Sequence, residues 1–423
     1  MVKTDGFGSL VLSDGRSNFA FDSPRLRLAR ALCTLAVFAL PAFVISTPWG
    51  LRPATLLSLL AVGLAPDCLW HHLRLLRRPL LVLTAIAVLV SLVVSLSVLV
   101  HDTGWREADS RGRTLVMPMA LLITVAFRPP RAALWGGAVV GLLGACGVAL
   151  WQYVHGVPRA DGWTNAIVFG DMAAVLLVVV VFFRASGRMP WVVLGTLAGV
   201  TAVVLSGSRG TWLALGVIAL TGLLAGRRAR WWELLGVAAL GLAAALVLSP
   251  KVEERITALQ GDLARYSRGD MDSSSGARIQ LLQLAGKTFL AHPGTGVGVG
   301  KFDRAIHAEP LCQVPRTEGE EVCRLSHAHN DLAEWGATMG APGVVALVVL
   351  YGLPLWLFAR RSFARPFPRR SRSAALTGVT LVLVFIICGL TQSLFAHQLT
   401  ATSYVLLVGM LLGFSLRENP QKD

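Results

Sequence analysis

Long apolar runs constrain this chain more than any other feature. The hydrocarbon core of a bilayer needs about 20 apolar residues per helix, and twelve runs of roughly that length follow one another along the 423 residues. The composition agrees, because 54% of the residues are hydrophobic and only 15% charged, against about a quarter charged in soluble domains. The sequence therefore predicts an all-α integral membrane protein with about 12 transmembrane helices. The expected spans are residues 29–47, 53–69, 80–100, 114–127, 132–154, 164–183, 190–206, 211–225, 231–249, 337–359, 374–394 and 399–415.

The basic residues predict the orientation of these spans. The net charge of +15 would suit a nucleic-acid partner, but the charges lie between apolar runs, which excludes that function. Lys and Arg concentrate in the two chain ends and in alternate connections, whereas the short connections of the other set hold few. By the positive-inside rule, both termini are expected in the cytoplasm of an inner-membrane protein, with residues 250–336 in the periplasm. The expected domains are a bundle of spans 1–9 at 1–249, a periplasmic loop domain at 250–336, and spans 10–12 at 337–423.

The periplasmic segment has the composition of a small soluble domain, since it holds 12 of the 24 acidic residues. An apolar stripe predicts a helix that could lie on the membrane surface; it consists of Val252, Ile256, Leu259 and Leu263. A second helix is expected after the SSSG turn, with Ser273, Ser274 or Ser275 as its cap and Arg278 in its first turn.

Two cysteines, Cys312 and Cys323, enclose a polar stretch of this segment. In an oxidising periplasm such a pair is expected to form a disulfide. The alternative is a zinc site with His327 and His329, which the spacing favours less because the close C-x2-C pairing of structural zinc sites is missing.

Two charged residues lie near the expected outer membrane surface. Arg209 follows the seventh span, where its guanidinium could bind a diphosphate; equally, it could reach lipid phosphate or cap a helix. Asp171 lies within the sixth span, where an unpaired carboxylate is costly, so a salt bridge to an Arg is favoured over catalysis.

The string SHAHNDLAEWG is the most informative. Ser326 is expected to cap a helix that opens with His327 or His329 and continues into the tenth span. His329 would then lie at the positive end of a helix, where the neutral imidazole that can accept a proton is favoured. A purely structural role for both histidines is the alternative.

Two further patterns are weaker. The turn HPGTGVGVGKF could offer backbone N–H groups to phosphate, or it could be purely structural; it is not a P-loop. The acid-x-acid pairs Glu107/Asp109 and Asp270/Asp272 could hold a divalent metal, but such pairs are common on solvated loops.

Two motifs resemble those of the bacterial O-antigen ligases, within the wider O-antigen ligase and polymerase family. Arg, three residues and Leu appear as RGTWL from Arg209 to Leu213. The second motif of the family is His, then Asn, Ser or Gln, nine residues, Gly, two residues and Gly. It matches the continuous string HNDLAEWGATMGAPG, with His329, Asn330, Gly340 and Gly343 at its fixed positions. The segment between the motifs resembles that of the family around a second Arg, here Arg278.

The resemblance implies an inverting glycosyltransferase of the GT-C type that needs no cofactor and no metal. It would transfer O-antigen polysaccharide from undecaprenyl diphosphate to a sugar hydroxyl of lipid A-core oligosaccharide at the periplasmic face. Arg209 and Arg278 would bind the diphosphate, and His329 would accept the proton of the acceptor hydroxyl. Supporting candidates around them are His327, Asn330 and Asp171.

Three alternatives stay open. An O-antigen polymerase or a protein O-oligosaccharyltransferase of the same family would use another acceptor. A lipid or solute transporter is a different class, but transporters place ionisable groups near the bilayer midplane, whereas here Arg and His concentrate at one surface.

Overall fold

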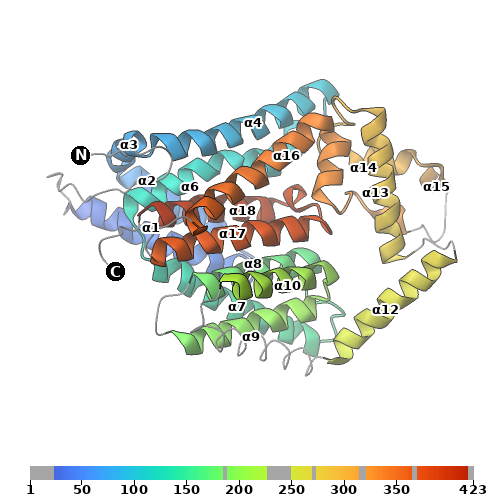
Figure 1. Cartoon of the computed structure of the whole chain (residues 1–423), viewed down its shortest axis with the longest axis horizontal. Coiled ribbons are helices and arrows are strands. Elements are labelled where there is room, and N and C mark those ends of the chain that lie inside the picture. Colours follow the sequence, from blue (N-terminus) through green and yellow to red (C-terminus); the bar gives the residue numbers. More distant parts are fainter. Residues whose placement is uncertain are drawn as a thin grey trace.

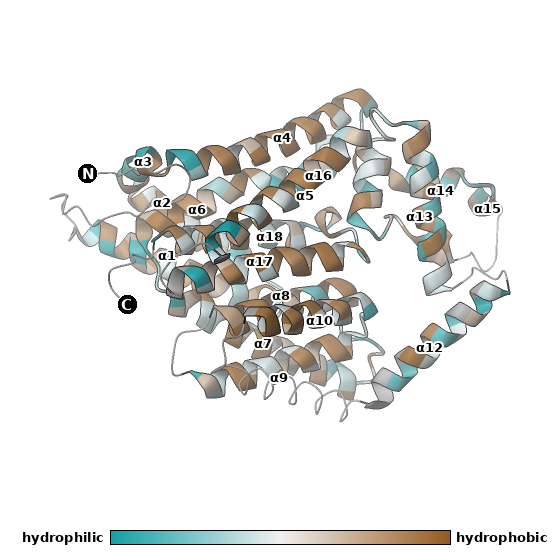
Figure 2. Cartoon of the chain, viewed as in Figure 1, coloured by the Kyte–Doolittle hydropathy of each residue, from teal (hydrophilic) through white to brown (hydrophobic). Residues whose placement is uncertain are grey.

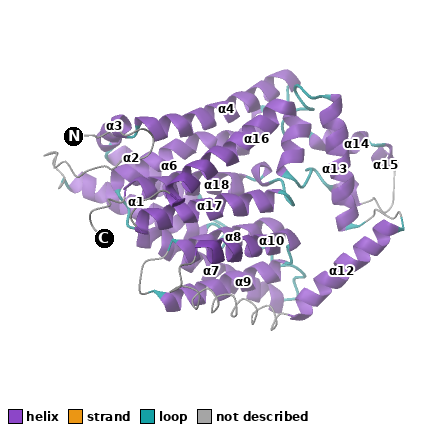
Figure 3. Ribbon diagram, in the orientation of Figure 1, coloured by secondary structure: helices purple, strands orange, loops and turns teal. Residues whose placement is uncertain are grey.

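Helices form nearly all of the described structure. The computed structural model describes residues 23–183, 188–225, 249–268, 273–313, 321–363 and 369–417, and no strand occurs in these ranges (Figure 3). The expected all-α fold class is confirmed.

Most of the expected spans coincide with a helix of the bundle. In chain order these helices are α1 (Pro24–Phe43), α2 (Arg52–Leu64), α3 (Pro66–Leu75), α4 (Arg77–His101), α5 (Trp105–Gly112), α6 (Val116–Phe127), α7 (Arg131–Val154), α8 (Ala166–Phe182), α9 (Met189–Ser206), α10 (Arg209–Ala225), α16 (Asp331–Phe363), α17 (Arg369–Gly389) and α18 (Gln398–Arg417). Of the ninth expected span, residues 231–248 lie outside the described residues.

The number of twelve spans is not confirmed. Seven of the described helices are long and apolar enough to cross a membrane, and α2 with α3 would make an eighth. These two helices are bent by 88° at Ala65, so the second expected span is not one straight helix. Proline disfavours the helical conformation of the preceding residue, so Pro66 explains the break. Helices α8 and α10 are apolar but shorter.

Segments distant in the sequence form the centre of the bundle. Helix α17 packs against α8 and α10 on one side and against α16 and α18 on the other (Figure 1). Helix α7 packs closely on α1 because it presents glycines there: a Cβ on Gly137 or Gly141 would lie 2.2 or 2.0 Å from a carbonyl oxygen of α1. Small residues at such contacts let membrane helices approach one another closely.

The outer faces of the bundle are apolar (Figure 2). On α4, Leu92 and Leu99 are 63% and 69% exposed. A soluble bundle buries such side chains, whereas lipid solvates them. The apolar helices and these exposed faces together define a multi-pass membrane protein.

The helices between α10 and α16 lie beyond one end of the bundle (Figure 1). They are α12 (Ser249–Ser267), α13 (Ser274–Ala291), α14 (Phe302–Ala308), α15 (Pro310–Gln313) and η3 (Glu321–Arg324). Ala277, Leu281, Phe302 and Ile306 are buried in a core separate from that of the bundle. Oγ of Ser273 accepts the N–H of Gly276, which confirms the expected cap of α13.

The expected disulfide is confirmed. Cys312 and Cys323 are bonded, with their Cα atoms 5.5 Å apart. Because both thiols are used in this bond, the zinc alternative is wrong. The bond fastens η3, and with it the start of the chain segment that leads to His327, onto α15.

A glycine-rich turn packs against a break in α16. Gly340 has φ 65° and ψ −158°, so the helical hydrogen bonds stop there. Val297 N–H donates to the carbonyl of Ala337, and Gly298 N–H donates to that of Thr338, at 3.0 and 2.9 Å. These N–H groups are therefore used within the protein, so the structural interpretation of HPGTGVGVGKF holds and the phosphate interpretation fails for them.

Candidate active site

His329 lies in the loop that leads into α16, at the end of the bundle nearest α13. Its φ of 49° is in the left-handed region, which is uncommon for a residue other than glycine. The helix begins at Asp331, and Oδ1 of Asn330 accepts the N–H of Ala333 at 3.0 Å. The cap is therefore Asn330, and the expectation that Ser326 caps this helix is wrong. Nδ2 of Asn330 also donates to the carbonyl of Leu390, which ties the loop to the end of α17.

A buried ion pair between Arg111 and Glu334 contacts this loop. Nη2 of Arg111 lies 3.4 Å from Oε1 of Glu334, and the two side chains are 2% and 1% exposed. Oε2 of Glu334 accepts the N–H of Ala328 at 2.8 Å, and Nδ1 of His327 lies 3.9 Å from Oε1. Burying two charges is costly, so a pair that also holds a loop N–H points to a fixed loop conformation. Neither Arg111 nor Glu334 was predicted from the sequence, although an acidic residue beside an apolar run is itself a signal.

His327 faces a third histidine, His397. The ring centroids of His327 and His397 are 5.7 Å apart, and Nε2 of Gln392 lies 3.0 Å from Nε2 of His397. Gln392 and His397 belong to the connection between α17 and α18. The eleventh expected span, residues 374–394, includes Gln392, but α17 ends at Gly389.

The charge of Arg278 acts on His329. Burial first, then Arg278 and then His327, lower the pKa of His329 to about 4. Burial and the neighbouring His327 and His329 lower the pKa of His397 to about 4 as well. The neutral His329 expected from the sequence is therefore favoured, but by burial and a guanidinium rather than by the start of a helix.

Arg209 is the first residue of α10 and reaches α12 and α13. Its Nη1 lies 3.3 Å from Oδ2 of Asp262 and 3.3 Å from Oγ of Ser275. A cation at the positive end of a helix is unfavourable without an anion nearby. Asp262 supplies one, and the side chain of Arg209 stays 24% exposed.

Asp171 joins α8 to the beginning of α10. Its Oδ1 accepts the hydroxyl of Thr211 at 2.5 Å, and that hydroxyl also lies 2.8 Å from Oγ of Ser208. Arg278 is close enough for its charge to act on Asp171 as well as on His329. The expected salt bridge was to an Arg. Asp171 interacts electrostatically with Arg278, but its direct hydrogen bond is with Thr211.

The structure brings the three principal candidates to one region. Ser275, bonded to Arg209, and Arg278 are three residues apart on α13, so they share a face of that helix. Arg278 in turn acts on His329. Among the supporting candidates, His327 acts on His329, Asn330 holds the loop before α16, and Asp171 bonds Thr211 in the first turn of α10.

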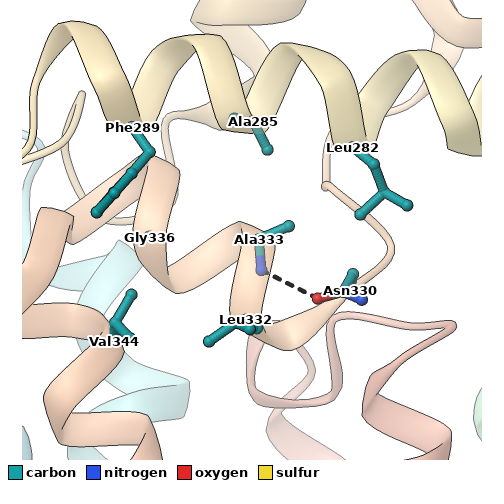
Figure 4. Close-up of a pocket in the computed structure, with 9 residues that line it drawn as sticks. Leu282, Ala285, Phe289, Asn330, Leu332, Ala333, Gly336 and Val344 are labelled. Carbon is teal, nitrogen blue, oxygen red and sulfur yellow. Dashed lines mark hydrogen bonds between the residues drawn. The ribbon is translucent and has the colours of Figure 1, made fainter.

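An apolar cavity of about 420 Å³ lies between α13 and α16, next to this cluster (Figure 4). Leu282, Phe289 and Leu332 line it, and Asn330 is a polar residue at its wall. Leu282 follows Arg278 by one helical turn, so the cavity lies on the face of α13 that carries Arg278.

The acid-x-acid pair of α5 is already paired with cations. Glu107 lies 3.3 Å from Nζ of Lys301, and Asp109 lies 2.7 Å from Nη2 of Arg113. Asp270 and Asp272 lie outside the described residues. Within the described ranges, no group of three or more His, Cys, Asp or Glu is placed to hold a metal ion.

Fold and site define a multi-pass helical membrane protein with a cluster of Arg and His at one end of its bundle. Residues 194–348 match the family model described as O-Antigen ligase. The match supports the resemblance to the O-antigen ligase family that the two motifs predicted, and Arg209, Arg278 and His329 all lie inside the matched residues. A search of curated proteins finds no match.

Proposed function

We propose that this protein is an O-antigen ligase that moves a polysaccharide from undecaprenyl diphosphate to a sugar hydroxyl of lipid A-core oligosaccharide. The observation that carries the proposal is the position of Arg278, whose charge acts on the buried imidazole of His329. The guanidinium disfavours protonation of the imidazole and so keeps it a neutral base, and a guanidinium group is suited to binding a diphosphate leaving group.

The reaction needs three elements. The acceptor hydroxyl oxygen attacks the anomeric carbon from the face opposite the diphosphate, and the bond from that carbon to the diphosphate oxygen breaks, so the configuration inverts. His329 takes the hydroxyl proton, for which a neutral imidazole is required. Arg209 and Arg278 hold the negative charge that grows on the leaving diphosphate, with guanidinium forks that match phosphate geometry.

Asp262 has a defined place in this scheme. Its Oδ2 lies 3.3 Å from Nη1 of Arg209. A diphosphate carries more charge than a carboxylate and accepts more hydrogen bonds, so it replaces Asp262 as the partner of Arg209.

The topology follows from the charge pattern. We propose about twelve spans with both termini in the cytoplasm of the inner membrane, domains at 1–249, 250–336 and 337–423, and the site in the periplasm. In support, Arg417 at the end of α18 donates to the carbonyls of Thr124 and Pro129. This end of α18 lies opposite the end that begins beside His397. Labelling of single cysteines from either side of sealed vesicles tests this assignment.

The decisive experiment is reconstitution with carrier-linked polysaccharide and lipid A-core. The wild-type protein is expected to yield polysaccharide-capped lipid A-core, and His329→Ala is expected to yield none while still folding. Longer carrier-linked polymer would instead indicate a polymerase, and a glycosylated protein would indicate an oligosaccharyltransferase. Vesicle flux without transfer would indicate a transporter.

His101→Gln is the matched control. Nε2 of His101 lies 3.3 Å from the carbonyl of Thr295, away from the cluster. This substitution also removes an imidazole but is expected to leave transfer intact.

A further inference from the structure

Gln392 is buried beside two histidines and has one polar atom to spare. The residue is 2% exposed, and its Nε2 is used by His397 at 3.0 Å. Its Oε1 is buried and has no hydrogen-bond partner among the described residues. An unpaired buried carbonyl is costly, so a partner is expected in the working protein.

His329 has the complementary vacancy. Its Nδ1 is also buried without a hydrogen-bond partner in the described part of the chain. The two side chains are near enough for hydrogen bonding to Gln392 to favour the protonated form of His329. A carbonyl oxygen can accept a hydrogen bond from a ring N–H. An amide NH₂ group facing the imidazolium would instead disfavour the protonated ring, because both groups are donors.

We propose that Gln392 is a positioning residue for His329, and that His397 sets the orientation of its amide. Nε2–H of Gln392 donates to Nε2 of a neutral His397, which turns Oε1 toward Nδ1–H of His329. That hydrogen bond fixes one tautomer, in which Nε2 of His329 carries the lone pair. This inference rests on the proposed role of His329 as the base.

The arrangement explains how the positive charge of the reaction is held. When Nε2 of His329 takes the proton from the acceptor hydroxyl, the ring becomes an imidazolium. Oε1 of Gln392 already accepts from Nδ1–H, so the hydrogen bond strengthens without movement. A neutral amide does this without raising the pKa of the resting base as far as a carboxylate would.

Other charged groups around His329 act in both directions. Arg278 from α13 and His327 from the same loop disfavour the imidazolium, whereas Glu334 from α16 favours it. His397 is itself surrounded by His327, His329, Arg111 and Glu334. Since the Gln392 variants leave all of these groups in place, a change in the pKa of His329 in those variants can be assigned to Gln392.

The experiment is a titration of ¹⁵N-histidine-labelled full-length protein by NMR, with the His329 signals assigned from their loss in His329→Ala. Wild type is expected to show His329 protonated at Nδ1. Gln392→Glu is expected to raise the pKa of His329, and Gln392→Leu is expected to lower it and to mix the tautomers, each shift being about one unit. If Gln392 has a purely structural role, the pKa of His329 will shift in the same direction in both variants or in neither. That result would overturn the proposal.

Two further variants secure the assignment. His397→Phe is expected to resemble Gln392→Leu, and to add nothing in a Gln392→Leu background. Independent, additive effects would show that His397 does not act through the amide. Gln392→Glu keeps the shape of the side chain, so it carries the test where Gln392→Leu fails to fold.

Activity separates this inference from the proposed function. The kcat of Gln392→Leu is expected to fall about tenfold to a hundredfold, with the KM for donor unchanged. If the wild-type protein transfers no polysaccharide while the NMR shifts occur as expected, the proposed function is wrong and the hydrogen bond from His329 to Gln392 stands. If His329→Ala abolishes transfer while the Gln392 variants leave His329 unmoved, the inference is wrong and the proposed function stands.

Discussion

Nη1 of Arg209 lies 3.3 Å from Oγ of Ser275, three residues before Arg278 on α13. Arg209, from α10, thereby contacts the same face of α13 that carries Arg278. Like charges are held together in this way where an anion binds between them.

Substitutions at Arg209 and Asp262 separate a binding role from a structural ion pair. Arg209→Lys keeps the charge but loses the planar fork, so transfer is expected to fall at least about tenfold. Asp262→Asn removes the ion pair between Arg209 and Asp262 but leaves the guanidinium fork. Transfer is therefore expected to change by less than about threefold, since partly exposed ion pairs contribute little to stability. Equal losses in steady-state assays of the two variants would show that Arg209 serves the ion pair alone.

The low pKa of His329 sets the pH dependence of transfer. Because the folded-state value of about 4 lies below 6.5, the imidazole stays neutral throughout this interval. A base of this kind predicts a rate that changes little between pH 7 and pH 5, and falls only as pH approaches 4. An acidic limb centred near pH 6.5 in the rate profile would contradict the burial of His329.

The same shift affects stability. The unfolded chain binds a proton at His329 between pH 6.5 and 4, whereas the folded protein does not. Stability from this group is therefore complete above pH 6.5 and is lost as pH falls toward 4. His397 contributes in the same direction. In His397→Phe, thermal unfolding in detergent should depend less steeply on pH than in wild type; an equal slope would argue against a neutral His397.

The break in α16 requires glycine. At Gly340 the backbone is in a region almost restricted to glycine, and a Cβ would lie 2.5 Å from the carbonyl oxygen of Pro293. Gly340→Ala is expected to cost at least about 2 kcal/mol. Gly352→Ala, in the same helix with open space around it, is expected to stabilise by up to about 1 kcal/mol. Chemical unfolding of both variants measures the difference, and similar values would refute the account of the break.

The buried pair Arg111–Glu334 is expected to behave as one unit. Glu334→Gln or Arg111→Gln alone leaves a buried charge without its partner, which costs about 3–5 kcal/mol. The double variant is expected to lose much less than the sum. Additive losses in unfolding experiments would show that the two side chains are not coupled.

The sequence carries much of this account because apolar length and turn chemistry are local. Runs of apolar residues predicted most helices, and the SSSG turn predicted a cap at Ser273, Ser274 or Ser275, of which Ser273 is the one observed. The bend between α2 and α3 was not predicted, although Pro66 indicates a break in the helix, because the span was assigned by its length alone. The expected cap at Ser326 failed because Asn330, which also bonds the carbonyl of Leu390, is placed by a contact across the bundle.

The surroundings of the site could not be predicted in this way. Arg111 and Glu334 are separated by 223 residues, and no spacing rule connects them. Gln392 was assigned to a span because apolar residues surround it on both sides. What makes it part of the site is the early end of α17, which brings it to His397.

Equilibrium binding of undecaprenyl diphosphate to the reconstituted protein and its variants tests the central claim most directly. Arg209→Lys and Arg278→Lys are each expected to weaken binding about tenfold or more, whereas His329→Ala is expected to bind normally and yet transfer nothing. Wild-type affinity in both Arg variants would contradict the claim that two guanidinium groups and one imidazole serve a single diphosphate-linked donor.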